Sequence, residues 1–113
     1  MPGTPMSVDV AINEKGEATY KSSDSGVESD GTININAGED AYITFEPASG
    51  QTWVFVDPWI VIDPTGGDIT FVSGSPSAVV IQDDNPNGPP SAYTYCLQTS
   101  IQPLDPRIIN KGN

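Results

Sequence analysis

The sequence has no histidine, and residues 22–106 contain no lysine or arginine either. That stretch holds twelve carboxylates, and the cationic side chains of the chain are Lys15, Lys21, Arg107 and Lys111. A surface without a basic patch cannot gain affinity for nucleic acid by displacing counterions from phosphates. We therefore predict that the protein binds neither DNA nor RNA. The net charge of −11 also makes an anionic membrane an unfavourable partner.

The lack of histidine removes the usual general base for a serine or cysteine nucleophile and the usual ligand of zinc and copper. Cys96, the single cysteine, has no neighbouring cation in the sequence to stabilise a thiolate. No pair among the fifteen carboxylates stands out as an acid–base couple. We therefore predict a protein that is not an enzyme and that binds neither zinc nor copper. The free thiol is expected to be buried as a small apolar side chain.

Targeting and membrane-spanning segments are also missing from the sequence. The first residues lack the basic and apolar regions of a signal peptide, and no apolar run is long enough to span a membrane. We expect residues 1–113 to form a single domain, with residues 1–5 as a flexible N-terminal segment. The location stays open between the cytoplasm, an assembled particle and a compartment reached by a signal that was removed.

The apolar residues that are present favour strands, because leucine occurs only twice while valine, isoleucine and aromatic residues dominate. Alternation of apolar and polar residues predicts strands at 6–12, 17–20, 32–36, 41–45, 52–56, 59–62, 68–72, 78–82 and 91–99, with a last edge strand at 107–110. Turn-forming glycine and proline residues separate them. This pattern predicts an all-β fold, a small two-sheet Greek-key β-sandwich of about 7–9 short strands.

The longest predicted strand, 91–99, carries alternate large residues on one face: Tyr93, Tyr95 and Leu97. We expect this face to be buried against Val80 and against a ring of the facing sheet such as Phe55 or Phe71. The other face would then leave Cys96 near the surface, in conflict with the burial expected of a free thiol.

This strand, Ser91-Ala92-Tyr93-Thr94-Tyr95-Cys96, resembles the Tyr-x-Tyr and Cys strand that leads into the copper loop of cupredoxins. The strand ending near Phe45, the aromatic middle region and Val79-Val80-Ile81 follow a similar order. The resemblance implies a β-sandwich. It does not extend to copper, because the family's two histidine ligands are missing and Leu97-Gln98-Thr99-Ser100 follows the cysteine. An immunoglobulin-like sandwich is nearly as similar, although its pair of inter-sheet cysteines is missing.

One segment has the spacing of metal ligands. Residues 83–88 match D-x-N-x-N-G, the first half of an EF-hand calcium loop, with ligand oxygens on Asp83, Asn85 and Asn87. The closing glutamate is absent and Thr94 takes its place. Asn-Pro, Asn-Gly and Pro-Pro pairs also produce this pattern in an ordinary connection between strands. We favour that second interpretation, so no cofactor is expected and calcium is kept as the alternative.

Exposed aromatic side chains are the other candidates for a functional role. Trp59 follows a proline at the mouth of a predicted loop, where its ring can stack on a sugar or enter a pocket of a partner protein. Tyr42 is a second candidate contact. Trp53 shares a face with Phe55 and is expected in the core instead.

Together these observations predict a non-catalytic structural or protein-interaction module that docks on a larger assembly, such as a particle surface, a filament or a partner protein. The partner is expected to be another protein or further copies of the same chain. The alternative is a ligand-binding module, calcium-dependent and directed at carbohydrate, that uses residues 83–88 and Trp59.

Overall fold

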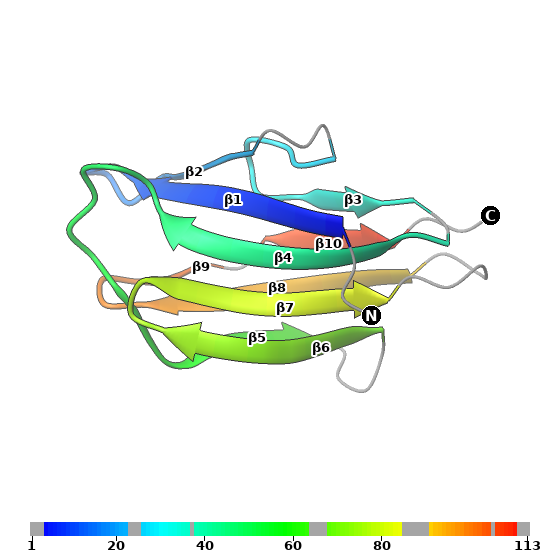
Figure 1. The fold of residues 1–113 in the computed structure, drawn as a ribbon. Coiled ribbons are helices and arrows are strands. Elements are labelled where there is room, and N and C mark those ends of the chain that lie inside the picture. Colours follow the sequence, from blue (N-terminus) through cyan, green and yellow to red (C-terminus); the bar gives the residue numbers. More distant parts are fainter. Residues whose placement is uncertain are drawn as a thin grey trace.

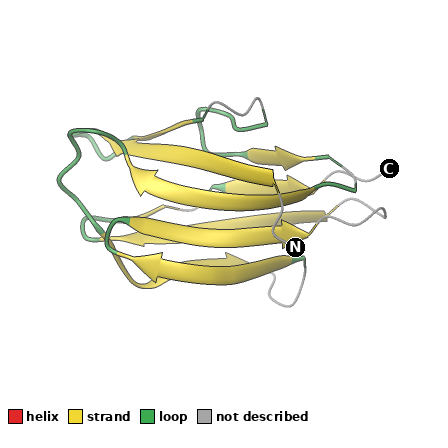
Figure 2. Ribbon diagram, viewed as in Figure 1, coloured by secondary structure: helices red, strands yellow, loops and turns green. Residues whose placement is uncertain are grey.

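The computed structural model describes residues 4–22, 26–36, 38–63, 68–84, 91–104 and 106–110. These residues form ten strands and no helix (Figure 2). The strands are β1 (Thr4–Ile12), β2 (Ala18–Lys21), β3 (Ile33–Ile35), β4 (Asp40–Pro47), β5 (Phe55–Asp63), β6 (Ile69–Ser75), β7 (Ala78–Asp84), β8 (Ser91–Thr99), β9 (Pro103–Leu104) and β10 (Arg107–Asn110). Within the described residues, no helix is long and apolar enough to cross a membrane.

The strands form two sheets that pack face to face (Figure 1). Sheet A has the order β2-β1-β4-β7-β6, and sheet B has the order β3-β10-β8-β5 with β9 paired to β8. The pairs β1–β4 and β3–β10 are parallel, and the other pairs are antiparallel. The predicted all-β, two-sheet fold is therefore confirmed, with mixed sheets.

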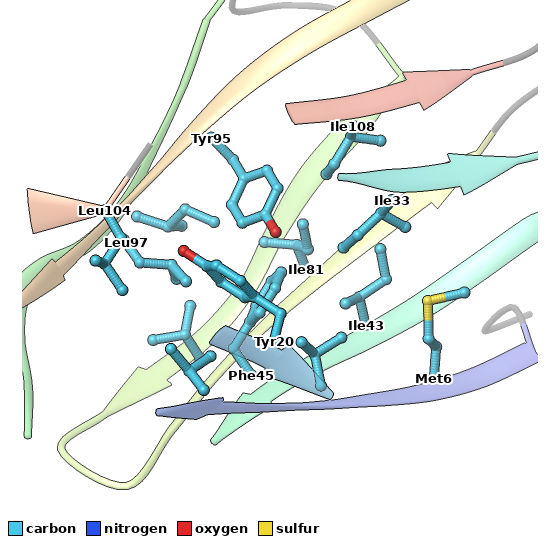
Figure 3. Close-up of a cluster of buried hydrophobic side chains, with 14 of the residues drawn as sticks. Met6, Tyr20, Ile33, Ile43, Phe45, Ile81, Tyr95, Leu97, Leu104 and Ile108 are labelled. Carbon is cyan, nitrogen blue, oxygen red and sulfur yellow. The ribbon is translucent and has the colours of Figure 1, made fainter. Parts of the chain in front are cut away.

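Period-two alternation explains how these segments fill the core. In β1, β4 and β7 the buried residues alternate along the strand and are apolar except for Asp83 near the end of β7, and β8 presents its own alternate residues from the facing sheet. Figure 3 shows side chains of both sheets meeting between the layers, among them Phe45, Ile81, Tyr95 and Leu97. The rings of Phe45 and Tyr95 are tilted against each other with centroids 5.1 Å apart, a spacing at which aromatic rings attract.

The prediction for residues 91–99 is confirmed for the strand and its buried face, but it is wrong for the residues that pack against that face. Tyr93, Tyr95 and Leu97 are buried as expected. Val80 is only half-buried, because the inward residues of β7 are those on either side of it. Phe55 belongs to sheet B itself, and Phe71 is exposed, so neither ring faces β8 from sheet A. The facing ring is Phe45.

Two further expectations about strands need correction, and one strand was not predicted. The strands predicted at 52–56 and 59–62 are one strand, β5, whose pairing with β8 shifts register between Phe55 and Ile60. The expected edge strand at 107–110 lies between β3 and β8 in the interior of sheet B. The short strand β9 was not predicted.

Cys96 is half-buried on the outer face of sheet B, so the expected burial of its thiol is only partial.

Candidate functional site

Strands β5 and β6 end their sheets on the same side of the sandwich and contact each other (Figure 1). We call these two strands the β5/β6 edge. Large apolar side chains are exposed there: Val56 and Val61 on β5, and Phe71 and Val72 on β6. The other exposed large apolar side chains of the described residues are Val54 and Ile101. The β5/β6 edge therefore holds most of the exposed apolar surface contributed by large side chains in the described part of the chain.

A β-bulge explains the exposure on β6. Phe71 pairs with Ile81 and Ser73 pairs with Val80, so Val72 is an extra residue without a partner on β7. A bulge of this kind bends its strand and redirects side chains. Two consecutive apolar residues consequently lie in solvent, where a regular strand would expose every second one.

Trp59 connects the two strands of this edge. Its ring lies against Gly74 of β6 so closely that a Cβ atom at position 74 would overlap the indole. Trp59 has a φ of 73°, in the left-handed region that side chains other than glycine rarely adopt. The preceding Asp57–Pro58 peptide bond is cis. The positive φ of Trp59 holds this half-buried aromatic residue in a strained backbone conformation, and such strain concentrates at binding sites.

The edge is apolar and acidic at once. Asp57 and Asp63 lie exposed on β5, and the nearest cations in the sequence lie outside residues 22–106. Tyr42, the second aromatic candidate, lies half-buried on β4. Because β7 separates β4 from β6, the structure places Tyr42 apart from Trp59 and from this edge.

A buried polar cluster lies at one end of the sandwich, where β7 and β10 both finish (Figure 1). Asp83 of sheet A and Asn110 of sheet B are both 0% exposed. The Asn110 Nδ2 group donates to Asp83 Oδ1 at 2.7 Å and to Asp68 Oδ2 at 3.3 Å. One amide therefore joins two carboxylates, one on β7 and one just before β6.

Burial is the main influence on Asp83, and it raises the pKa of that carboxyl to about 7. The hydrogen bond from Asn110 acts in the opposite direction, whereas the charges of Asp68, Asp84 and Asp40 raise the pKa further. A buried carboxylate among other carboxylates is costly to ionise, which is why the proton is retained to a higher pH.

Among the predicted calcium ligands, only Asp83 belongs to the described residues, and its side chain is turned into the sandwich. Asn85 and Asn87 lie outside the described residues. The described part of the chain contains no group of three or more His, Cys, Asp or Glu side chains able to hold a metal. Calcium binding by this loop stays a prediction, and the structure assigns no metal to Asp83.

Sequence reasoning missed Asn110 and Asp68 as partners of Asp83. The signal was present in the alternation: Asp83 follows the inward positions Val79 and Ile81, and Asn110 follows the inward position Ile108. A polar residue on a buried face needs a polar partner, so the two could have been matched.

No protein-family model matches the chain, and no curated protein matches its sequence. The two-sheet architecture is compatible with the β-sandwich that the resemblance to cupredoxins and immunoglobulin domains implies. Membership of either family is not shown.

Proposed function

We propose that this protein is a non-catalytic interaction module that docks on a larger assembly through the β5/β6 edge. The observation that carries the proposal is the gathering of Val56, Val61, Phe71 and Val72 on two adjoining edge strands. Apolar side chains exposed on neighbouring edge strands are typical of places where another chain pairs or packs.

Edge strands offer a second attraction to a partner, because one side of each has backbone N–H and C=O groups without a neighbouring strand. An extended segment of another protein can pair with such groups and place its side chains beside the exposed apolar ones. Trp59 supports this role. Its ring is already immobilised against Gly74, so little conformational freedom is lost when a partner packs on it.

The charge of the edge supports a partner protein that carries lysine or arginine around an apolar centre. Asp57 and Asp63 lie exposed beside the apolar residues of β5, and strand pairing places the nearest basic residue to Asp63, Arg107, two strands away on β10. Complementary charge accelerates association and rejects like-charged partners. A second copy of this chain, with its net charge of −11, fits the same edge less well.

The test is co-purification from the native source with tagged protein, followed by surface plasmon resonance on the protein recovered. We expect the double variant Val61→Thr/Phe71→Thr to lose at least about tenfold in affinity, as removal of one or two central apolar contacts does. Ile101→Thr is the matched control, because Ile101, at 59%, is the most exposed large apolar residue in the described part of the chain and belongs to neither β5 nor β6. Binding should also weaken at high salt.

Equal loss in the Ile101→Thr variant would contradict a role of the edge, as would unchanged binding by the double variant. Analytical ultracentrifugation of the purified chain tests the remaining outcome, which is that the edge binds a second copy of the chain. Self-association that disappears in the double variant would assign the edge to homo-assembly and not to a different protein.

A further inference from the structure

Two buried oxygen atoms in the Asp83–Asn110 cluster have no hydrogen-bond partner among the described residues: Asp83 Oδ2 and Asn110 Oδ1. They belong to the same two side chains that already share the hydrogen bond from Asn110 Nδ2 to Asp83 Oδ1. Leaving one buried acceptor unpaired costs roughly 1–3 kcal/mol, and native proteins do so rarely. Two such atoms on one bonded pair require an explanation.

The chemistry of the pair supplies one. An ionised carboxylate and an amide oxygen are both acceptors, so these two atoms cannot bond to each other while Asp83 is charged. A primary amide that donates to one carboxyl oxygen through the N–H on the side of its own carbonyl places that carbonyl oxygen next to the second carboxyl oxygen. A single proton on the carboxyl then completes a ring of two hydrogen bonds and satisfies both atoms.

We propose that Asp83 and Asn110 form a proton-operated clasp between the two sheets, in which protonated Asp83 Oδ2 donates to Asn110 Oδ1. The clasp joins the C-terminal end of β7 in sheet A to the C-terminal end of β10 in sheet B. When the proton leaves, one hydrogen bond remains and two oxygens repel, so this end of the sandwich is less firmly closed. The inference is independent of the β5/β6 edge.

The groups that act on Asp83 place the release of this proton near neutral pH. They are Asp40 on β4, Asp84 on β7, Asp68 before β6 and the amide of Asn110 on β10, and none of them is cationic. Together with burial, the three acids raise the pKa of Asp83 to about 7, against 3.8 for an ordinary aspartate.

The direction of the pH effect follows from proton linkage. Between about pH 4 and about pH 7 the folded protein keeps a proton that the unfolded chain releases. The stability contributed by Asp83 is therefore complete below this interval, falls as the pH rises through it, and is lost above it. This direction is the opposite of that of a salt-bridged aspartate.

The decisive variant is Asp83→Asn, because its side-chain amide reproduces the protonated carboxyl at every pH and can donate to Asn110 Oδ1. In thermal melts at about pH 8, we expect the variant to melt several degrees above the wild type, and the difference should shrink steadily as the pH is lowered toward about 4. Asp9→Asn is the matched control, since Asp9 is an exposed strand aspartate on β1 and is not among the groups that shift the pKa of Asp83, so the pH dependence of the wild type should stay in place.

A variant Asp83→Asn with the same pH dependence as Asp9→Asn would overturn the clasp. A measurement on the wild type keeps the test independent of how the variants fold: a carbon-13 NMR titration of the aspartate carboxyls should show one with a midpoint near neutral pH. The absence of any such carboxyl would also overturn it. So would a melting temperature that rises with calcium at about pH 8, since the oxygens would then serve a metal ion.

Discussion

Strands β5 and β8 are hydrogen-bonded neighbours in sheet B and each has nine residues, yet they bury their side chains differently. From Tyr93 to Thr99, every second residue of β8 is buried. In β5, three consecutive residues after Phe55 are exposed before Ile60 returns to the core. The difference shows that equal length and membership of the same sheet do not give two strands the same alternation.

The position of each strand in the sandwich explains this contrast. β8 has β10 on one side, β5 on the other, and sheet A across the core, so a shift by one residue would move every apolar side chain into solvent. β5 has a hydrogen-bonded neighbour on one side only, and its register with β8 shifts between Phe55 and Ile60. Irregular backbone is tolerated at the edge because fewer contacts depend on it.

The largest effect on stability is expected for Leu97→Ala in β8. Leu97 is fully buried, and its removal should lower the free energy of unfolding by about 2–5 kcal/mol in denaturant melts, as other buried leucines do. The matched change in β5 is Val61→Ala, which should cost within about 0.5 kcal/mol because the side chain is exposed. Similar losses in the two variants would show that β5 is as firmly packed as β8.

An intermediate effect is expected for Tyr95→Phe. The Tyr95 hydroxyl donates to the Gly31 carbonyl at 2.6 Å, a buried bond between β8 and the segment that precedes β3. Its loss leaves a buried carbonyl unpaired and should cost about 1–3 kcal/mol in the same melts. Tyr42→Phe removes a hydroxyl from a half-buried ring and serves as the control. No difference between the two variants would mean that the Gly31 carbonyl finds another donor.

The smallest effect is expected on the outer face of β8 itself. Thr94 is exposed and pairs with Asp63 of β5 and Arg107 of β10, so Thr94→Ala should change the free energy of unfolding by less than about 0.5 kcal/mol. Chemical denaturation of this variant beside Leu97→Ala decides which face of the strand is buried. A larger loss for Thr94→Ala would invert the assignment.

Much of the fold could be predicted because it depends on local alternation. The bounds of β8 coincide with the predicted 91–99, and β1, β4 and β7 contain the predicted alternation. The partners across the core could not be predicted, because they depend on which strands face each other. Phe45 opposite Tyr95 is set by the order of strands in two sheets, and no local pattern encodes that order.

The candidate site was less accessible to prediction for a related reason. Trp59 was identified as a candidate contact from its place after a proline, and the structure places it across the edge. The bulge at Val72 and the exposure of Phe71 come from pairing with β7, where an extra residue has no signature in composition. Asp83 was interpreted as a loop residue because the turn-forming sequence after it dominated the pattern.

The parallel pairing of β3 with β10 has a consequence for how the chain is made. Residues 33–35 lie beside residues 108–110, so the ribosome must synthesise about seventy further residues before β3 can meet its partner. Sheet A, by contrast, has all of its strands once residue 84 has emerged. If sheet A forms at that stage, its apolar inner face is exposed to solvent until β8 and β10 have been synthesised, and transiently exposed apolar surface promotes aggregation.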